Sequence, residues 1–252
     1  MNTVFRLRPI NDKTIEEFKE SYIWFSRPMY YKDVDDANVV SFLELNEGIN
    51  NAFSRIFKDV PEIANDVVKN GICCFTKTLP KLRHWKKFPS GKKSIIVEYD
   101  RKIIEDHFLN VYGIGDCFKD VEYLDNSLIF KTSSGYDILW SEDDNGLFYK
   151  SIKDFERDSK QMDLLFLRMF TRINSRFRIQ KESRIIIGGK NVQCFNPDLK
   201  GYKIKIPIES IVRIYIQPLT PTCFVEKLKS VLPDGIPIEI KKPLCLSTPP
   251  KQ

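Results

Sequence analysis

The sequence predicts an α+β fold: a single domain over residues 1–243 with a mixed, mainly antiparallel sheet and flanking helices. Two observations favour this class. Short runs rich in β-branched and aromatic residues recur along the chain, and stretches with helical apolar spacing lie between them. No internal repeat and no Gly/Ser-rich linker divides the 252 residues, a length that suffices for one substantial core.

The N-terminal segment predicts a strand, a helix and a second strand in that order. Residues 3–10 alternate as a strand does, which places Arg6 and Arg8 on one face. Residues 11–21 space their apolar side chains as a short amphipathic helix, and the aromatic segment 22–28 predicts the second strand.

The remaining elements follow the same two patterns. Helices are expected over 39–71, 103–112, 155–173 and 223–232, and strands over 71–77, 93–100, 120–124, 183–189, 202–218 and 236–242. Weaker signals over 127–133, 136–143 and 146–152 predict short strands or an inserted hairpin, and 244–252 is expected to be a disordered tail.

Charge and hydropathy restrict the class of protein. Lys and Arg number 40 against 34 Asp and Glu, and the net charge of +6 permits an anionic partner without requiring one. No apolar run approaches the roughly 18 residues that span a bilayer, and the N-terminus lacks the apolar region of a secretory signal. We therefore expect a cytoplasmic protein that does not enter the membrane.

Common metal and nucleotide motifs are absent from the sequence. Six cysteines are scattered without a Cys-x-x-Cys pair, and His84 and His107 are the two histidines, so we expect no zinc site and no disulfide framework. The sequence contains no Gly-x-Gly-x-x-Gly, Gly-x-x-x-x-Gly-Lys-Ser/Thr, Gly-x-Ser-x-Gly or His-Glu-x-x-His motif. These absences argue against a Rossmann dehydrogenase, a P-loop NTPase, an α/β hydrolase and a zincin.

Residues 176–187 carry the first candidate site. Gln180, Glu182 and Arg184 are spaced two apart, and in a strand such residues point to one face. This row is either the acidic edge of an active site or a solvated strand in which Glu182 pairs with Arg184 or Arg176.

An acidic cluster contains Asp33, Asp35 and Asp36. Close carboxylates can hold a divalent cation, as a metal-dependent nuclease requires. The alternative is a solvated acidic loop that caps the following helix.

A basic and aromatic loop over residues 77–93 is the third candidate. Cations interleaved with aromatic rings suit a surface that follows a phosphate backbone and stacks on bases. The alternative is an exposed loop that Trp85 anchors in the core. The candidate nucleic-acid-binding residues are Lys81, Arg83, Trp85, Lys86 and Lys87.

Three motifs in this order resemble a widespread bacterial family, the domain of unknown function 2971. The first motif contains Trp24, Phe25, Ser26 and Pro28, with a partial match at Asp33 and Asp36. The second motif contains Cys74, Phe75, Trp85, Gly91, Glu98, Tyr99 and Asp100. The third motif contains Arg172, Phe177, Gln180, Glu182 and Arg184. The resemblance covers 5–217. It departs from the family at Lys32 and Val34, which replace an Asn and a Pro around Asp33, and in the third motif at Arg172, Phe177 and Gln180, where the family has Lys, Trp and Glu. It implies no activity, but members of such families resemble bacterial defence effectors or toxins.

The motif order also resembles that of ADP-ribosyltransferases. These enzymes open with a strand that bears Arg or His, continue with a helix and an aromatic, Ser-containing strand, and end with Glu-x-Glu or Gln-x-Glu on a later strand. The resemblance implies NAD as the substrate, with Glu182 and Gln180 as the catalytic pair. It further implies a dinucleotide-binding set of Arg6, which would clamp the pyrophosphate, together with Trp24, Ser26, Tyr30 and Arg184.

The preferred hypothesis is therefore an ADP-ribosyltransferase-like effector that cleaves NAD and modifies a protein or nucleic acid. Its cleft would lie between the N-terminal strand–helix–strand segment and the strand of Glu182, and no metal is expected. A non-catalytic module that binds nucleic acid or protein through 77–93 is the alternative. A metal-dependent nuclease is the third hypothesis.

Overall fold

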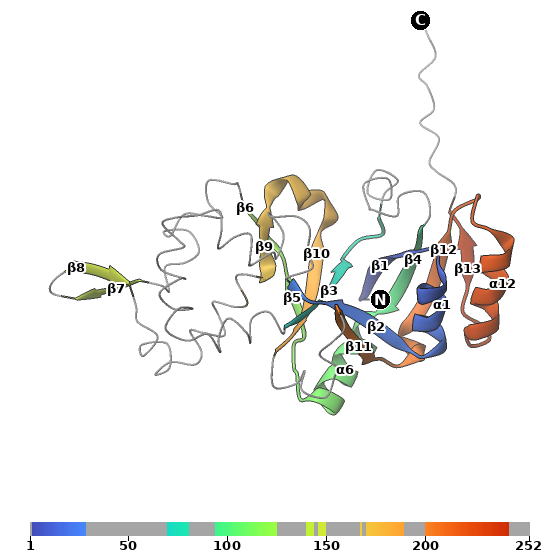
Figure 1. Cartoon of the computed structure of the whole chain (residues 1–252), viewed down its shortest axis with the longest axis horizontal. Helices are drawn as coiled ribbons and strands as arrows, with labels where there is room; N and C mark the ends of the chain where they lie inside the picture. Colours follow the sequence, from blue (N-terminus) through green and yellow to red (C-terminus); the bar gives the residue numbers. More distant parts are fainter. Residues whose placement is uncertain are drawn as a thin grey trace, which may run out of the picture. The chain divides into compact units, whose positions relative to one another are not determined.

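The computed structural model describes residues 2–28, 70–80, 94–124, 140–143, 146–149, 167, 170–188 and 200–241. It confirms the α+β class, because helices accompany a mixed sheet in which most neighbouring strands are antiparallel (Figure 1). Residues 39–69 of the helix predicted over 39–71, residues 81–93 of the loop predicted over 77–93, and the tail over 244–252 lie outside the described residues. The end of that predicted helix is wrong, because Gly71 begins a strand.

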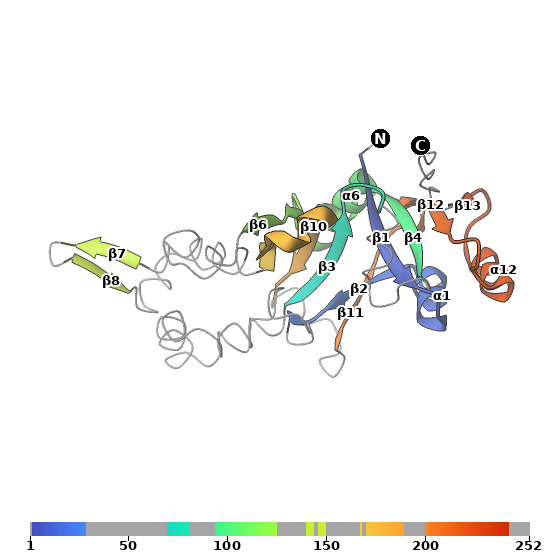
Figure 2. The ribbon, with the colours of Figure 1, turned by 90° about the horizontal axis from the view of Figure 1, so that it is seen from above.

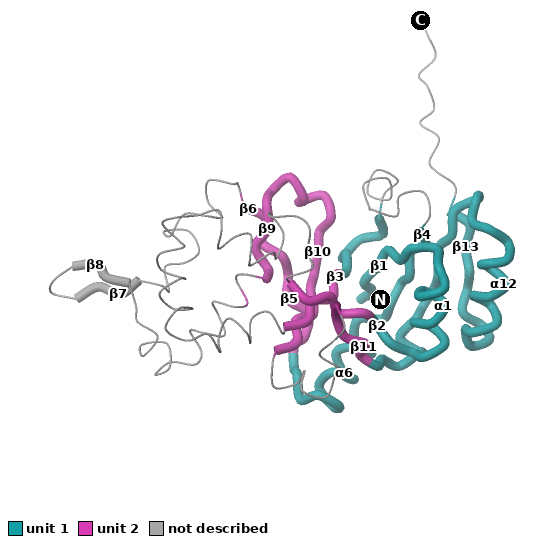
Figure 3. Tube along the Cα trace, viewed as in Figure 1, with its two compact units in different colours: residues 1–23, 75–115, 205–252 teal, residues 24–74, 116–204 magenta. Residues whose placement is uncertain are grey.

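The chain forms two compact units, each assembled from separate stretches of sequence (Figure 3). Unit 1 contains residues 1–23, 75–115 and 205–252, and unit 2 contains residues 24–74 and 116–204. Three of the four boundaries fall inside strands, in β2 (Tyr22–Ser26), β3 (Gly71–Thr76) and β11 (Gly201–Lys205). A single domain over 1–243 stays a prediction.

The strands of unit 1 surround β1 (Thr3–Pro9) and β4 (Ser94–Asp100), which pair antiparallel over their whole length. On one side β1 pairs with the end of β3, and on the other β4 pairs antiparallel with β12 (Ile211–Ile216). The short strand β13 (Ile238–Ile240) then pairs parallel with β12. These strands confirm the predicted strand segments 3–10, 93–100 and 236–242.

Among its described residues, unit 1 also contains the helices α1 (Asp12–Lys19), α6 (Arg101–Tyr112) and α12 (Thr222–Val231) and the 3₁₀ turn η4 (Ile208–Ser210). Asn11 caps α1, because its side chain accepts the Thr14 N–H at 3.1 Å. Helices α1 and α12 lie side by side in both views (Figures 1 and 2), and Lys227 of α12 pairs with Asp12 at 3.0 Å.

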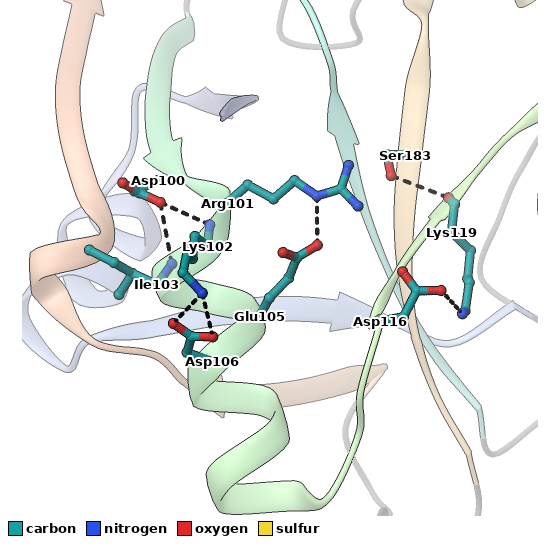
Figure 4. Close-up of polar contacts among 9 residues, drawn as sticks. All are labelled: Asp100, Arg101, Lys102, Ile103, Glu105, Asp106, Asp116, Lys119 and Ser183. Carbon is teal, nitrogen blue, oxygen red and sulfur yellow. Dashed lines mark hydrogen bonds and ion pairs between the residues drawn. The ribbon is translucent and has the colours of Figure 1, made fainter. Parts of the chain in front are cut away.

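Helix α6 begins directly after β4, where Asp100 caps it (Figure 4). One Asp100 carboxylate oxygen accepts the N–H groups of Lys102 and Ile103 at 2.8 and 3.3 Å. An i,i+4 ion pair joins Arg101 to Glu105 at 2.7 Å, and Gly113 ends the helix with φ +66°. Local sequence therefore defines both ends of α6.

The described part of unit 2 contains shorter strands and a 3₁₀ segment. These elements are β5 (Phe118–Asp120), β6 (Glu122–Leu124), the hairpin of β7 (Trp140–Asp143) and β8 (Gly146–Tyr149), β9 (Arg172–Asn174), η3 (Ser175–Gln180) and β10 (Glu182–Ile187). β10 pairs with β3 and runs antiparallel to β5, and β6 runs parallel to β9. The inserted hairpin is confirmed; the helix predicted over 155–173 is wrong at its end, where β9 begins.

Two glycines of unit 2 allow strands to approach closely. A Cβ at Gly201 would overlap the carbonyl oxygen of Phe25 and lie 2.6 Å from the Trp24 ring. A Cβ at Gly71 would lie 2.9 Å from side-chain carbons of Ile187 and Tyr202. Only a residue without a side chain fits at Gly201, because the nearest obstruction there is backbone.

Candidate functional site around Glu182

The sequence motif Gln-x-Glu-x-Arg does not form one row on a strand. Gln180 is the last residue of the 3₁₀ segment η3, and Lys181 follows it with φ +47° before β10 begins at Glu182. The prediction that Gln180 shares a strand face with Glu182 is therefore wrong. The cause is local: Asn174 accepts the Arg176 N–H at 2.8 Å and starts a 3₁₀ turn where strand spacing predicts extended backbone.

Glu182 and Arg184 do share a face of β10, and they form a buried ion pair. Residue exposure is 8% for Glu182 and 0% for Arg184. Arg184 donates from Nε and Nη2 to the same Glu182 oxygen, Oε2, at 3.0 and 2.8 Å, and its Nη1 donates to the carbonyl of Phe170 at 2.8 Å. The pairing predicted as an alternative for Glu182 is present, but it is buried rather than solvated.

Because the pair is buried, breaking it should change the free energy of unfolding more than breaking a surface ion pair would. Taking two charges out of water costs several kcal/mol, which only good geometry and further hydrogen bonds can offset. Here all three guanidinium nitrogens of Arg184 donate to named acceptors. The result is a carboxylate fixed in one position, while the Glu182 side chain keeps 10% of its surface exposed.

Tyr123 of β6 holds the backbone of the same residue. Its hydroxyl oxygen accepts the Glu182 N–H at 2.6 Å, and the Glu182 carbonyl accepts the Val121 N–H at 3.1 Å. Burial raises the pKa of Tyr123 to about 12. The hydrogen bond from the Glu182 N–H lowers this pKa, and the negative charge of the Glu182 carboxylate raises it. The thiol of Cys74 in β3 also raises the pKa of Tyr123, as the smallest of these effects.

Along one edge, β10 pairs antiparallel with β5. Ser183 Oγ donates to the carbonyl of Lys119 at 3.3 Å, and the Lys119 ammonium pairs with Asp116 at 2.7 Å (Figure 4). Glu182 is therefore the first residue of a strand that is paired in the sheet, rather than part of a loop.

The predicted arginines of β1 lie in unit 1. Arg6 is buried, with Nη1 4.0 Å from Glu17 Oε2 and its guanidinium 6.0 Å from the ring centre of Phe75. Arg8 forms a close ion pair with Glu17, and burial followed by the charge of Arg6 lowers its pKa. The two arginines share a face, as predicted. A common cleft for Arg6 and Glu182 stays a prediction, since the residues belong to different units.

Trp24 and Ser26 are half-buried residues of β2. The Trp24 ring lies against Gly201, and Ser26 is opposite Ile72 in the pairing of β2 with β3. Their role beside nicotinamide stays a prediction. Other predicted site residues lie outside the described residues: Tyr30, Asp33, Asp35, Asp36, Lys81, Arg83, Trp85, Lys86 and Lys87.

Sequence reasoning missed Tyr123, Phe170 and Glu17. Glu17 could have been found, because the predicted helix after β1 carries it on the buried side with Phe18. Tyr123 and Phe170 carry no local signal, since their contacts to Glu182 and Arg184 are tertiary. Within the described part of the chain, no group of three or more His, Cys, Asp or Glu side chains could hold a metal ion.

No protein-family model, curated protein or solved structure matches the chain. Among the described helices, none has both the length and the apolar character needed to cross a membrane. The site can therefore be interpreted from its own chemistry alone: a carboxylate held by a buried arginine at the start of β10, on a residue whose backbone N–H donates to a tyrosine hydroxyl.

Proposed function

We propose that the protein is an ADP-ribosyltransferase-like effector that cleaves NAD and transfers ADP-ribose to a protein or nucleic acid. The observation that carries the proposal is the Glu182 carboxylate, which Arg184 holds through two hydrogen bonds while a tenth of the side chain stays exposed. A fixed negative charge at a rigid strand end suits the stabilisation of a developing positive charge.

The reaction defines the role of that carboxylate. The bond between ribose C1′ and the nicotinamide nitrogen breaks, and its electron pair leaves with nicotinamide. The ribose becomes oxocarbenium-like, and an acceptor heteroatom then bonds to C1′ and releases its proton to solvent. Glu182 would hold a ribose hydroxyl and stabilise the positive charge electrostatically.

Arg184 takes a different role in this proposal from the one implied by the resemblance. Its three guanidinium nitrogens donate to Glu182 and Phe170, and the residue has no exposed surface. We therefore assign Arg184 to the positioning of Glu182 rather than to phosphate binding. Arg6 remains the residue proposed to bind the pyrophosphate. The residues proposed to line the nicotinamide side are Trp24, Ser26 and Tyr30. Gln180 is proposed to position the acceptor.

A cytoplasmic location belongs to the same proposal. NAD and the macromolecular acceptors are available there.

The first test is nicotinamide release from labelled NAD in a host-cell lysate, with transfer of the labelled ADP-ribose followed in parallel. Glu182→Asp keeps the charge of the ion pair and shortens the carboxylate reach by one methylene, so it should lower activity at least about 100-fold if the carboxylate acts on the ribose. Glu122→Gln is the matched control. Glu122 pairs with Arg172 at 2.8 Å in the same unit but is exposed, so its removal should leave activity unchanged.

A second variant separates catalysis from folding. Replacing both partners, as Glu182→Leu with Arg184→Met, removes the carboxylate without leaving a buried charge alone. A folded double variant without NAD cleavage supports the proposal. Wild-type protein that neither consumes NAD nor transfers label contradicts the proposal. Cleavage of nucleic acid by that protein, abolished by a chelator, would favour the metal-dependent nuclease instead.

A further inference from the structure

The segment before Glu182 carries an exposed basic surface that the proposed NAD chemistry does not use. Residues 172–181 read RINSRFRIQK, with four cations and no acidic side chain. Arg176, Arg178 and Lys181 are exposed, whereas Arg172 is half-buried and pairs with Glu122 at 2.8 Å. We define the basic ridge as Arg176, Phe177, Arg178 and Lys181. Most of the basic ridge lies on the 3₁₀ helix η3, which is drawn as a coiled ribbon between β9 and β10 in Figure 1.

The backbone brings the cations of the ridge together. The Lys181 N–H donates to the Arg178 carbonyl at 3.3 Å, which closes the last turn of η3. Lys181 adopts φ +47°, a left-handed conformation that is unfavourable for a non-glycine residue. Such strain persists where the surrounding structure imposes it, and it concentrates at functional sites.

An arginine–aromatic stack lies within the same ridge. The Arg176 guanidinium is 4.6 Å from the ring centre of Phe177, so the planar group rests on the half-buried ring. Proteins that bind single-stranded nucleic acid combine cations along the backbone with aromatic or guanidinium planes on which bases stack. The ridge provides both kinds of group within six residues of sequence.

We propose that the basic ridge binds single-stranded nucleic acid, with Arg178 and Lys181 on phosphates and the Arg176–Phe177 stack beneath a base. This surface differs from the loop over 77–93, and its binding does not depend on NAD cleavage. If both proposals hold, the ridge delivers a nucleic-acid acceptor to the site that begins at the next residue, Glu182.

The test is fluorescence anisotropy of a labelled oligouridylate with the full chain, over a series of salt concentrations and without NAD. The two phosphate contacts, from Arg178 and Lys181, predict a slope of log K against log salt of roughly −1.4, since each contact contributes about −0.7 for single strands. The double variant Arg178→Gln with Lys181→Gln should weaken binding at least about tenfold at low salt and make the slope less negative by about 1.4.

A charge-matched control excludes a general field effect. Lys19→Gln with Lys229→Gln removes two exposed cations from α1 and α12 and should leave affinity within about twofold. Equal losses in both double variants, absence of oligouridylate binding, or binding confined to phosphatidylserine vesicles would each overturn the proposal. Oligouridylate binding by a chain that does not cleave NAD supports the ridge and separates it from the proposed enzyme activity.

Discussion

At the scale of single residues, the Glu182–Arg184 pair governs both stability and the proposed chemistry. Two charges with residue exposures of 8% and 0% tolerate burial because Arg184 meets an acceptor with each of its three nitrogens. Removing one partner leaves the other charged group buried without its counterion, which is the costly case for such pairs.

The first prediction compares single and paired replacement. Glu182→Gln should lower the free energy of unfolding by about 3–5 kcal/mol, whereas Glu182→Leu with Arg184→Met should recover most of that loss. Urea unfolding followed by circular dichroism measures both. A single variant as stable as wild type would mean that the pair is solvated in solution.

The second prediction concerns Tyr123 and alkaline pH. Burial raises its pKa to about 12 in the folded chain, above the usual 10, so the unfolded chain loses the proton first as pH rises. The Tyr123 contribution to stability is thus complete below pH 10 and lost as pH rises towards 12. Tyr123→Phe should flatten this part of the stability curve.

Thermal unfolding of wild type and Tyr123→Phe between neutral and alkaline pH measures the difference. Tyr215 has its pKa raised to about 12 by burial and by its 2.8 Å hydrogen bond to Glu98, so it contributes equally to both proteins. Parallel stability curves for the two proteins through pH 10 to 12 would contradict the prediction.

At the scale of elements, the strands and helices with local signals could be predicted from the sequence. β1 and α6 are examples: strand alternation sets the arginine face of β1, while Asp100 and Gly113 mark the ends of α6. The position of Gln180 could not be predicted from the sequence. Polar residues spaced two apart are compatible with a strand, and this spacing gives no sign of the 3₁₀ segment η3 or of the left-handed backbone at Lys181. The Tyr123 contact to Glu182 joins residues far apart in sequence, so no local pattern reports it.

The third prediction tests the close approach of β2 and β11. Gly201→Ala should lower the free energy of unfolding by at least about 3 kcal/mol or prevent folding, because the new Cβ would meet the Phe25 carbonyl and the Trp24 ring. Gly115→Ala is the matched control, since its Cβ would contact only Leu109, at an ordinary 3.7 Å. Equal thermal unfolding midpoints for the two variants would exclude the clash.

At the scale of the whole molecule, the C-terminal segment completes unit 1. β12 pairs along β4, β13 pairs with β12, and α12 packs beside α1. The fourth prediction is that a chain ending at Ile204 loses cooperative unfolding, because β4 loses its partner strand and α1 its neighbouring helix. A cooperative thermal transition at the wild-type midpoint would show that unit 1 does not need this segment.

The interleaved course of the chain also constrains how such a protein can change over time. The chain passes from one unit to the other at 23/24, 74/75, 115/116 and 204/205. No contiguous stretch of coding sequence specifies either unit, so recombination at a single junction cannot transplant one of them into another protein. Moving unit 2 with its ion pair would need junctions around two separate segments, whereas point substitutions can change that pair or the arginine strand in place.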